Sequence, residues 1–339
     1  MTTLILDEPG KLRVTTTDAP AADLPPGHAL VRVHRVGVCG TDWHAYAGRQ
    51  PFFSYPRVLG HELGVEVVAV NDPASDLRPG DRCSVEPYVN CEACVACRRG
   101  KGNCCVNIKV LGVHADGGMR ERFVLPARKL HKSSKLAFDQ LALVETLAIG
   151  CHAVARAQLD PGERVLVLGA GPIGLSVVPF VQASGAVPIV ADVSAERLAA
   201  AKRLMKVEHA VKADDALVET LKSLTSDELP TAVIDATGNP KSMMRTFELV
   251  APGGRIVFVG LFQGDVSFND PNFHKRECTL MGSRNALPGD FTRIIDLVER
   301  GVVDTTPWIT HRCAAAEFPG KIADWQRPDA GLLKAMLEF

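Results

Sequence analysis

Residues 165–174 read VLVLGAGPIG, and this stretch decides the fold of the second half of the chain. Its four leading apolar residues predict a buried strand, and its glycines match G-x-G-x-x-G at the start of a helical pattern. Gly169 permits a tight turn, Gly171 lets a pyrophosphate approach the backbone, and Gly174 lets the helix pack closely on the strand. Because a helix N-terminus favours phosphate charge, the stretch predicts a dinucleotide site.

Asp192 ends the next predicted strand, at the distance of about 20 residues that the fingerprint requires. Its carboxylate would accept hydrogen bonds from the adenosine ribose and repel a 2′-phosphate, so the sequence favours NAD over NADP. We expect further cofactor contacts from Pro172, Ile173 and Arg197, with Arg197 stacking near the adenine or lying on the helix surface.

Two residues that follow later strand patterns are predicted to border the nicotinamide. They are Thr237 and Leu261. Core packing accounts equally well for Leu261 and its neighbour Phe262.

The apolar runs indicate two domains. Residues 146–282 alternate strand and helix patterns, which predicts an α/β domain whose parallel sheet carries helices on both faces. Residues 1–145 and 283–339 are expected to form a mostly β domain, with a cysteine-rich lobe at about 88–108. Residues 165–191 carry no charge and are long enough to span a bilayer, but glycines and prolines interrupt them, so we expect strand, turn, helix and strand.

Composition narrows the function classes. The chain has 339 residues, 46% of them hydrophobic, and a net charge of −1, which gives no general attraction to nucleic acid or anionic membranes. The N-terminus lacks the pattern of a signal peptide, so we expect a cytoplasmic protein. In such a reducing compartment the ten cysteines are expected to be thiols, and clustered thiols bind metal.

Four cysteines follow the spacing C-x2-C-x2-C-x7-C, which suits a tetrahedral zinc site. They are Cys91, Cys94, Cys97 and Cys105. Four thiolates leave no open position, so this zinc is expected to be structural. The spacing disfavours an iron–sulfur cluster, and unliganded thiols rarely cluster in this way. Cys104 is an alternative to Cys105, and Cys83, Cys151, Cys278 and Cys313 are expected to be ordinary buried thiols.

A second candidate metal site lies upstream of the lobe. Cys39 follows an apolar strand pattern, and His61 and Glu62 form a Gly-His-Glu motif. A thiolate, an imidazole and a carboxylate leave one position of a zinc ion open, and an open zinc can polarise an alcohol oxygen.

With these motifs, residues 111–118 (LGVHADGG) and 145–150 (ETLAIG), the whole chain resembles the zinc-containing medium-chain alcohol dehydrogenase family. Within it, the chain is similar to the sorbitol, threonine and sugar-acid branch. Residues 282–286 (GSRNA) are similar to bacterial L-galactonate and L-gulonate 5-dehydrogenase-like proteins. The resemblance implies a GroES-like catalytic domain, a Rossmann NAD-binding domain and two zinc ions per chain.

The resemblance also implies residue roles. The catalytic zinc would be held by Cys39, His61, Glu62 and Glu145, with Glu145 contacting the metal or its water. Thr41 would take the alcohol proton and His44 would pass it to solvent through the nicotinamide ribose, while Asp42 orients backbone or His61. Two positions depart from the family pattern, and they are Val65 and Thr146.

Candidate substrate contacts are Arg284 and Asn285, together with Trp43 and His114, for which packing is an equal alternative. Lys334 is expected either near the cofactor phosphates or, somewhat better, as a solvated strand residue. The predicted activity is hydride transfer from a secondary alcohol of a small polyol or sugar acid to NAD, in a homo-oligomer, either tetramer or dimer. The alternatives are a threonine-type amino alcohol dehydrogenase, a zinc-free quinone or enone reductase, and an NAD-binding zinc protein without turnover.

Overall fold

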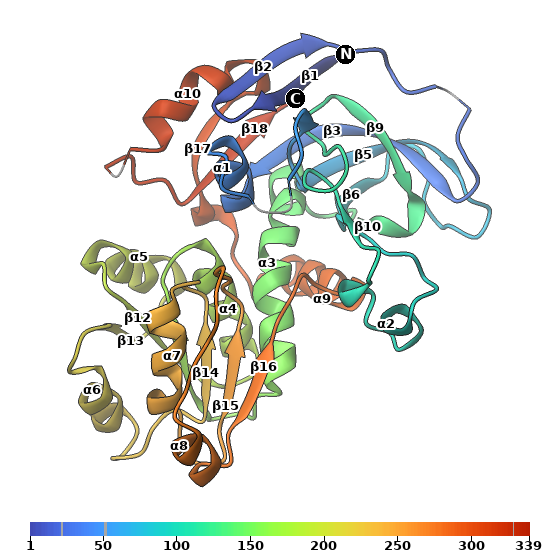
Figure 1. The fold of residues 1–339 in the computed structure, drawn as a ribbon. Coiled ribbons are helices and arrows are strands. Elements are labelled where there is room, and N and C mark those ends of the chain that lie inside the picture. Colours follow the sequence, from blue (N-terminus) through green and yellow to red (C-terminus); the bar gives the residue numbers. More distant parts are fainter. Residues whose placement is uncertain (22, 51–52, 328) are drawn as a thin grey trace. The chain divides into compact units, whose positions relative to one another are not determined.

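The computed structural model describes residues 1–21, 23–50, 53–327 and 329–339. The chain divides into two compact units (Figure 1). The first combines Met1–Thr146 with Ala286–Phe339, and the second is Leu147–Asn285.

The second unit is built on a six-stranded parallel sheet with the order β13-β12-β11-β14-β15-β16. Its strands are β11 (Arg164–Leu168), β12 (Val187–Asp192), β13 (His209–Lys212), β14 (Ala232–Asp235), β15 (Arg255–Phe258) and β16 (Thr279–Gly282). Its helices are the end of α3 (Phe138–Ala157), α4 (Pro172–Ala183), α5 (Ala195–Met205), α6 (Leu217–Leu224), α7 (Pro240–Leu249) and α8 (Asp270–Lys275). The strand order reverses between β11 and β14, which is where this fold binds its ligands at the carboxyl ends of the strands.

The glycine fingerprint forms the turn from β11 into α4, as predicted. A Cβ on Gly174 would overlap the carbonyl oxygen of Gly169, so only glycine allows the helix to start this close to the strand. Residues 165–191 form strand, helix and strand, and the central strands β11, β12 and β14 are almost wholly buried. The predicted strand–turn–helix–strand arrangement is therefore confirmed.

The first unit is mostly β. Its largest sheet has seven strands in the order β10-β6-β5-β3-β18-β17, with β9 also paired to β3. These strands are β3 (His28–Val38), β5 (Glu62–Asn71), β6 (Arg82–Val85), β9 (Arg122–Pro126), β10 (Leu130–Lys132), β17 (Ile309–Ala314) and β18 (Lys334–Glu338). Smaller sheets join β1 (Thr2–Glu8), β2 (Lys11–Thr16) and β4 (Arg57–Val58), and β7 (Tyr88–Val89) with β8 (Lys109–Val110).

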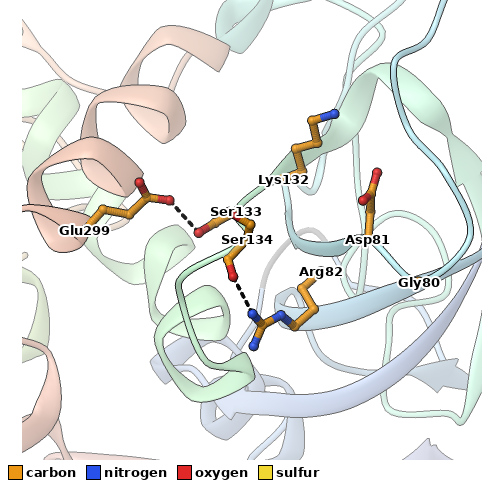
Figure 2. Close-up of a pocket in the computed structure, with 7 residues that line it drawn as sticks. All are labelled: Gly80, Asp81, Arg82, Lys132, Ser133, Ser134 and Glu299. Carbon is orange, nitrogen blue, oxygen red and sulfur yellow. Dashed lines mark hydrogen bonds between the residues drawn. The ribbon is translucent and has the colours of Figure 1, made fainter.

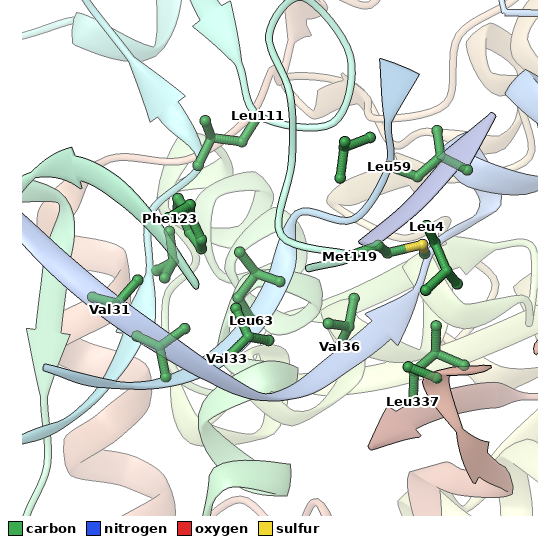
Figure 3. Packing of buried hydrophobic residues seen from close by; sticks show 14 of the residues in the cluster. Leu4, Val31, Val33, Val36, Leu59, Leu63, Leu111, Met119, Phe123 and Leu337 are labelled. Carbon is green, nitrogen blue, oxygen red and sulfur yellow. The ribbon is translucent and has the colours of Figure 1, made fainter. Parts of the chain in front are cut away.

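Short helices complete the first unit. They are α1 (Gly40–Tyr46), α2 (Val95–Arg98), α9 (Pro288–Glu299), α10 (Phe318–Trp325) and the 3₁₀ turns Gly102–Cys104, Ala127–Lys129, Thr306–Trp308 and Ala315–Glu317. The core gathers apolar side chains from β3, β5, β9 and β18, and Figure 3 shows Val33, Val36, Leu63 and Leu337 among them. This core fixes the ends of β3 and β5, which carry the candidate metal ligands.

Helix α3 is apolar and long enough to cross a membrane by length and composition. Its most apolar window is 72% buried inside the protein, as expected for a core helix.

Three parallel strands of the second unit are tied together at their amino ends by Glu163. Its carboxylate accepts hydrogen bonds from Arg255 Nη2, 2.6 Å from each oxygen, and from Thr231 Oγ1 at 2.9 Å. Burial would raise the pKa of Glu163, but its hydrogen bonds with Arg255, Asp160 and Thr231 hold it below the usual value.

We expect Glu163→Gln to lower the free energy of unfolding by about 1–3 kcal/mol at pH 7, because a hydrogen-bonded charge is lost. Because the pKa of Glu163 is lower in the folded protein than the unfolded value of about 4.3, its ionised carboxylate stabilises the fold above that pH. This stabilisation is lost as the pH falls through the folded-state pKa. The deficit should therefore shrink below about pH 4 in urea titrations of the two proteins run side by side. Glu219→Gln, at an exposed pair with Lys222, is the matched control. A deficit that is constant with pH would contradict the assignment.

Candidate active site

The register of two strands brings the first set of ligands together. β3 and β5 pair antiparallel with Gly37 opposite Glu62, so Cys39, just past the end of β3, lies beside His61 and Glu62. One ligand atom from each of these three residues lies within 4.8 Å of the other two. A Cβ on Gly37 would overlap the Glu62 carboxylate, so glycine at this position makes room for it.

Asp42 holds the two segments in place. Its Oδ2 accepts a hydrogen bond from the Cys39 backbone N–H at 2.9 Å, and its Oδ1 accepts one from Gly60 at 3.3 Å. The same Oδ1 lies 3.9 Å from Nδ1 of His61. Asp42 therefore orients backbone and faces His61, and a carboxylate is a common outer partner of a metal-ligating histidine.

The electrostatics of the group favour a cation. Burial alone would lower the pKa of His61, but the charges of Cys39 and Asp42 raise it well above its usual value. His61 and Glu62 are buried, and Nδ1 of His61 finds no hydrogen-bond partner among the described residues. A thiolate, an imidazole and a carboxylate are a donor set that zinc accepts, so these residues fit a zinc ion.

Lys334 is the first component that sequence reasoning misplaces. Its Nζ lies 2.6 and 2.9 Å from the two oxygens of Glu62, and its side chain is 3% exposed. The expectation of a solvated strand residue is wrong because β18 is an inner strand, paired with both β17 and β3. Burial would raise the pKa of Glu62, but the Lys334 ammonium, with His61, holds it below the usual value.

Glu145, on α3, lies outside the group of three. Its Oε1 accepts a hydrogen bond from the hydroxyl of Tyr88, on β7, and both side chains are buried. Burial raises the pKa of Glu145, and burial with the adjacent Glu145 charge raises that of Tyr88 well above its usual range. Sequence reasoning misses Tyr88, which belongs to no local motif.

The proposed proton carriers share helix α1, which begins directly after Cys39. Thr41 is half-buried and His44 is exposed. Trp43, on the same helix, packs edge-on against Phe318 with ring centroids 5.7 Å apart, which favours its packing role. His114 is exposed, and its Nδ1 accepts a hydrogen bond from Val110 N–H, so it closes a turn.

The cysteine lobe forms the second group of metal ligands. It brings together the sulfur atoms of Cys91, Cys94, Cys97 and Cys105 within 4.8 Å of one another. Cys105 Sγ accepts hydrogen bonds from the backbone N–H groups of Cys91 and Asn107, whereas Cys104 is exposed and outside the group. Backbone hydrogen bonds from Cys97 and Val106 lower the pKa of Cys94 to about 6, which favours its thiolate. Among the other cysteines, Cys83, Cys151 and Cys313 are buried and Cys278 is half-buried.

In the second unit, Asp192 is tied into the fingerprint turn. Its Oδ2 accepts the Ala170 N–H at 2.7 Å and its Oδ1 accepts the Ser194 N–H at 2.8 Å. Arg197 lies on the surface of α5, with Nη1 4.0 Å from Asp192 Oδ2. Pro172 and Ile173 form the first turn of α4.

The predicted nicotinamide contacts follow β14 and β15. Thr237 donates hydrogen bonds from both its backbone N–H and its hydroxyl to Asp235 Oδ1, at 2.9 and 2.8 Å. Leu261 is 75% exposed, so core packing is wrong as its explanation. Arg284 and Asn285 follow β16 in the same unit, and Asn285 has a left-handed backbone with φ 51°.

A polar pocket of about 530 Å³ lies elsewhere in the first unit (Figure 2). It is lined by Gly80, Asp81, Arg82, Lys132, Ser133, Ser134 and Glu299. Its charged groups already have partners: Lys132 pairs with Asp76, and Glu299 pairs with Lys135 and accepts from Ser133. The pocket contains none of the predicted site residues, and nothing in it resembles a metal or dinucleotide site.

A closed four-thiolate lobe, an open thiolate–imidazole–carboxylate group and a dinucleotide fingerprint together define a zinc-dependent dehydrogenase. Residues 25–135 match the family model of the alcohol dehydrogenase GroES-like domain, and residues 172–300 match that of the zinc-binding dehydrogenases. The chain belongs to this family of zinc-binding alcohol dehydrogenases. The predicted fold class, enzyme class and zinc cofactor are thereby confirmed.

Individual proteins similar to the chain are also dehydrogenases. The chain is 43% identical to L-galactonate-5-dehydrogenase of Escherichia coli K12, covering 92% of this chain and 91% of the relative. It is 33% identical to sorbitol dehydrogenase of Bacillus subtilis, covering 86% and 84%. A solved alcohol dehydrogenase structure from Escherichia coli CFT073, in complex with NADH, has a TM-score of 0.92 at 30% identity and covers 100% of this chain and 99% of that one.

The lobe geometry predicts different outcomes for two adjacent cysteines. We expect Cys105→Ser to reduce the zinc content from two ions per chain to one and to lower the melting temperature, because a structural zinc contributes folding free energy. Cys104→Ser is the matched control and should keep both ions. Elemental analysis and thermal melts measure the two quantities, and zinc lost from the Cys104 variant alone would reverse the ligand assignment.

Proposed function

We propose that this chain oxidises a secondary hydroxyl group of a polyol or sugar acid and passes the hydride to NAD. The observation that carries the proposal is the group of Cys39, His61 and Glu62, with ligand atoms within 4.8 Å of one another. Three protein ligands leave one tetrahedral position open to a substrate oxygen. Neither a zinc-free reductase nor a protein without turnover has a use for an open group of this kind.

Zinc bound by these residues would lower the pKa of a substrate hydroxyl, as it lowers that of bound water. The removal of the substrate proton is assigned to side chains that the fold already positions. Thr41 and His44 are three positions apart on α1, so they lie on the same face of the helix. Thr41 takes the hydroxyl proton, and His44, which is exposed, releases it to solvent. Because α1 begins directly after Cys39, this pair is anchored beside a proposed metal ligand.

The two glutamates have different roles in this proposal. Glu62 is the resting carboxylate ligand, since it belongs to the group of three and its charge is offset by Lys334. Glu145 has its own hydrogen-bond donor in Tyr88 and acts from outside that group.

The second unit supplies the cofactor side, as an NAD-binding domain, while the first unit is the catalytic domain. Gly169, Gly171 and Gly174 admit the pyrophosphate at the start of α4. Asp192, held by two backbone N–H groups, offers its charge to the ribose hydroxyls and disfavours a 2′-phosphate. Thr237 and Leu261, at the ends of neighbouring strands, border the nicotinamide.

A sugar acid of the L-galactonate type is the first substrate to test, because the relative with that activity is 43% identical. Arg284 and Asn285 are the proposed contacts to substrate hydroxyls or carboxylate, since a guanidinium binds a carboxylate with two parallel hydrogen bonds. We place the enzyme in the cytoplasm, where its thiols stay reduced and able to bind metal.

The assay follows absorbance at 340 nm with the purified chain, NAD or NADP, and a panel of aldonates, polyols and amino alcohols. We expect turnover with an aldonate or polyol, at least tenfold faster with NAD than with NADP and faster than with threonine. Cys39→Ser should reduce the rate at least a hundredfold and release one zinc, whereas Cys104→Ser should match the wild type. Turnover that survives Cys39→Ser, or two bound zinc ions without turnover of any alcohol, would refute the proposed function.

We also propose that the chain forms a homo-oligomer, a dimer or tetramer. β16 is an edge strand of the parallel sheet, and its Thr279, Leu280 and Gly282 are all exposed. An exposed strand edge is a template for pairing with another chain. Light scattering should give a multiple of 36.4 kDa for the wild type and a smaller mass for Leu280→Lys. Val302→Lys, at an exposed apolar residue of the first unit, is the control. A monomeric wild type would rule the oligomer out.

A further inference from the structure

Besides Asp42, which is held by backbone N–H groups, two buried carboxylates lie at the candidate metal group, and each is held by a different side-chain donor. Glu62 forms an ion pair with the ammonium of Lys334 and belongs to the group of three candidate ligands. Glu145 accepts the hydroxyl hydrogen of Tyr88 and stays outside that group. Glu145 still lies close enough for its charge to act on His61. The site therefore contains one more carboxylate than an open zinc centre can use.

A second buried cluster, which the proposed mechanism does not use, packs against Tyr88. The ring of Phe291, on α9, meets Tyr88 edge-on at 6.4 Å and stacks on His131 at 4.8 Å. Nε2 of His131 lies 3.1 Å from Glu86, which also forms a buried ion pair with Lys129. Glu86 precedes Tyr88 by two residues, and its N–H donates to the Lys129 carbonyl at 2.8 Å. The cluster thus fixes both the backbone and the ring of Tyr88.

The hydrogen bond from Tyr88 matters because a buried Glu145 carboxylate without a donor is unfavourable. A buried carboxylate that loses its hydrogen bond incurs a desolvation penalty, so it moves toward the nearest positive charge. A zinc ion held by Cys39, His61 and Glu62 would supply such a charge, and a second carboxylate bound to it would close the fourth position of the tetrahedron. The phenol satisfies one oxygen of Glu145 without adding charge to the site.

We propose that Tyr88 is a positioning residue that keeps Glu145 out of the metal's ligand sphere and so preserves the open position for substrate. The inference rests on the proposed function in that the open position is the substrate's. It concerns ligand geometry, however, and can be tested without any substrate.

The test uses the full chain with cobalt(II) in place of zinc and imidazole as an added ligand, read by visible absorption. Imidazole can shift the spectrum only at the open centre, because the four thiolates of the lobe leave it no position. We expect Tyr88→Phe to keep two metal ions, to change the cobalt bands and to bind imidazole at least tenfold more weakly than the wild type. Tyr88→Phe combined with Glu145→Gln should regain the imidazole response, since a neutral amide is a poorer ligand.

Ser133→Ala is the matched control, because it removes another hydroxyl-to-carboxylate hydrogen bond of the first unit, the 2.6 Å bond to Glu299 (Figure 2). It should lower stability and leave the cobalt spectrum unchanged. An unchanged spectrum and imidazole affinity in Tyr88→Phe would overturn the proposal, as would loss of cobalt from that variant or failure of the double variant to recover. If these results hold but the wild type oxidises no alcohol, the proposed function fails and the positioning role stands.

Discussion

Buried negative charge is the constraint on which the site depends. The half-buried thiol of Cys39 and the buried carboxylates of Asp42, Glu62 and Glu145 surround His61, where β3 ends and β5 begins. Charges in such a place must be paired or hydrogen-bonded, because their desolvation costs several kcal/mol each. Lys334 pairs with Glu62, and a bound divalent cation would offset further negative charge of the group. The donor set therefore suits a metal ion, and Asp42, Lys334 and Tyr88 hold the side chains and backbone around it.

The fold positions these charges with backbone rather than with long side chains. The antiparallel register sets Gly37 against Glu62, and the absence of a side chain at Gly37 leaves the carboxylate its space. The carboxylate of Asp42 then joins the start of α1 to the Gly60–His61 turn. Strand pairing consequently brings the candidate ligands together, and α1, with Thr41 and His44, begins directly after one of them.

The sequence predicts those parts of the molecule whose structure is determined by a short, local pattern of residues. The glycine fingerprint, the spacing of the cysteine lobe and the Gly-His-Glu motif each describe a short segment, and the structure places all three as expected. β13 and β16 leave no such signal, because these four-residue edge strands mix polar and apolar residues. Lys334 and Tyr88 were beyond prediction for another reason. Their partners, Glu62 and Glu145, are distant in sequence, and only sheet pairing and the packing of α3 reveal them.

The different donors explain why two chemically identical carboxylates behave differently. An ammonium carries a full positive charge, so it holds the pKa of Glu62 low and keeps an anion ready to bind a metal. A phenol offers only a hydrogen bond, so burial prevails at Glu145 and its pKa rises. The donors act together with position, because strand register places Glu62 in the group of three and Glu145 lies outside it on α3. The difference between the two carboxylates thus comes from residues beyond the candidate ligands, Lys334 on β18 and Tyr88 on β7 beside the cysteine lobe.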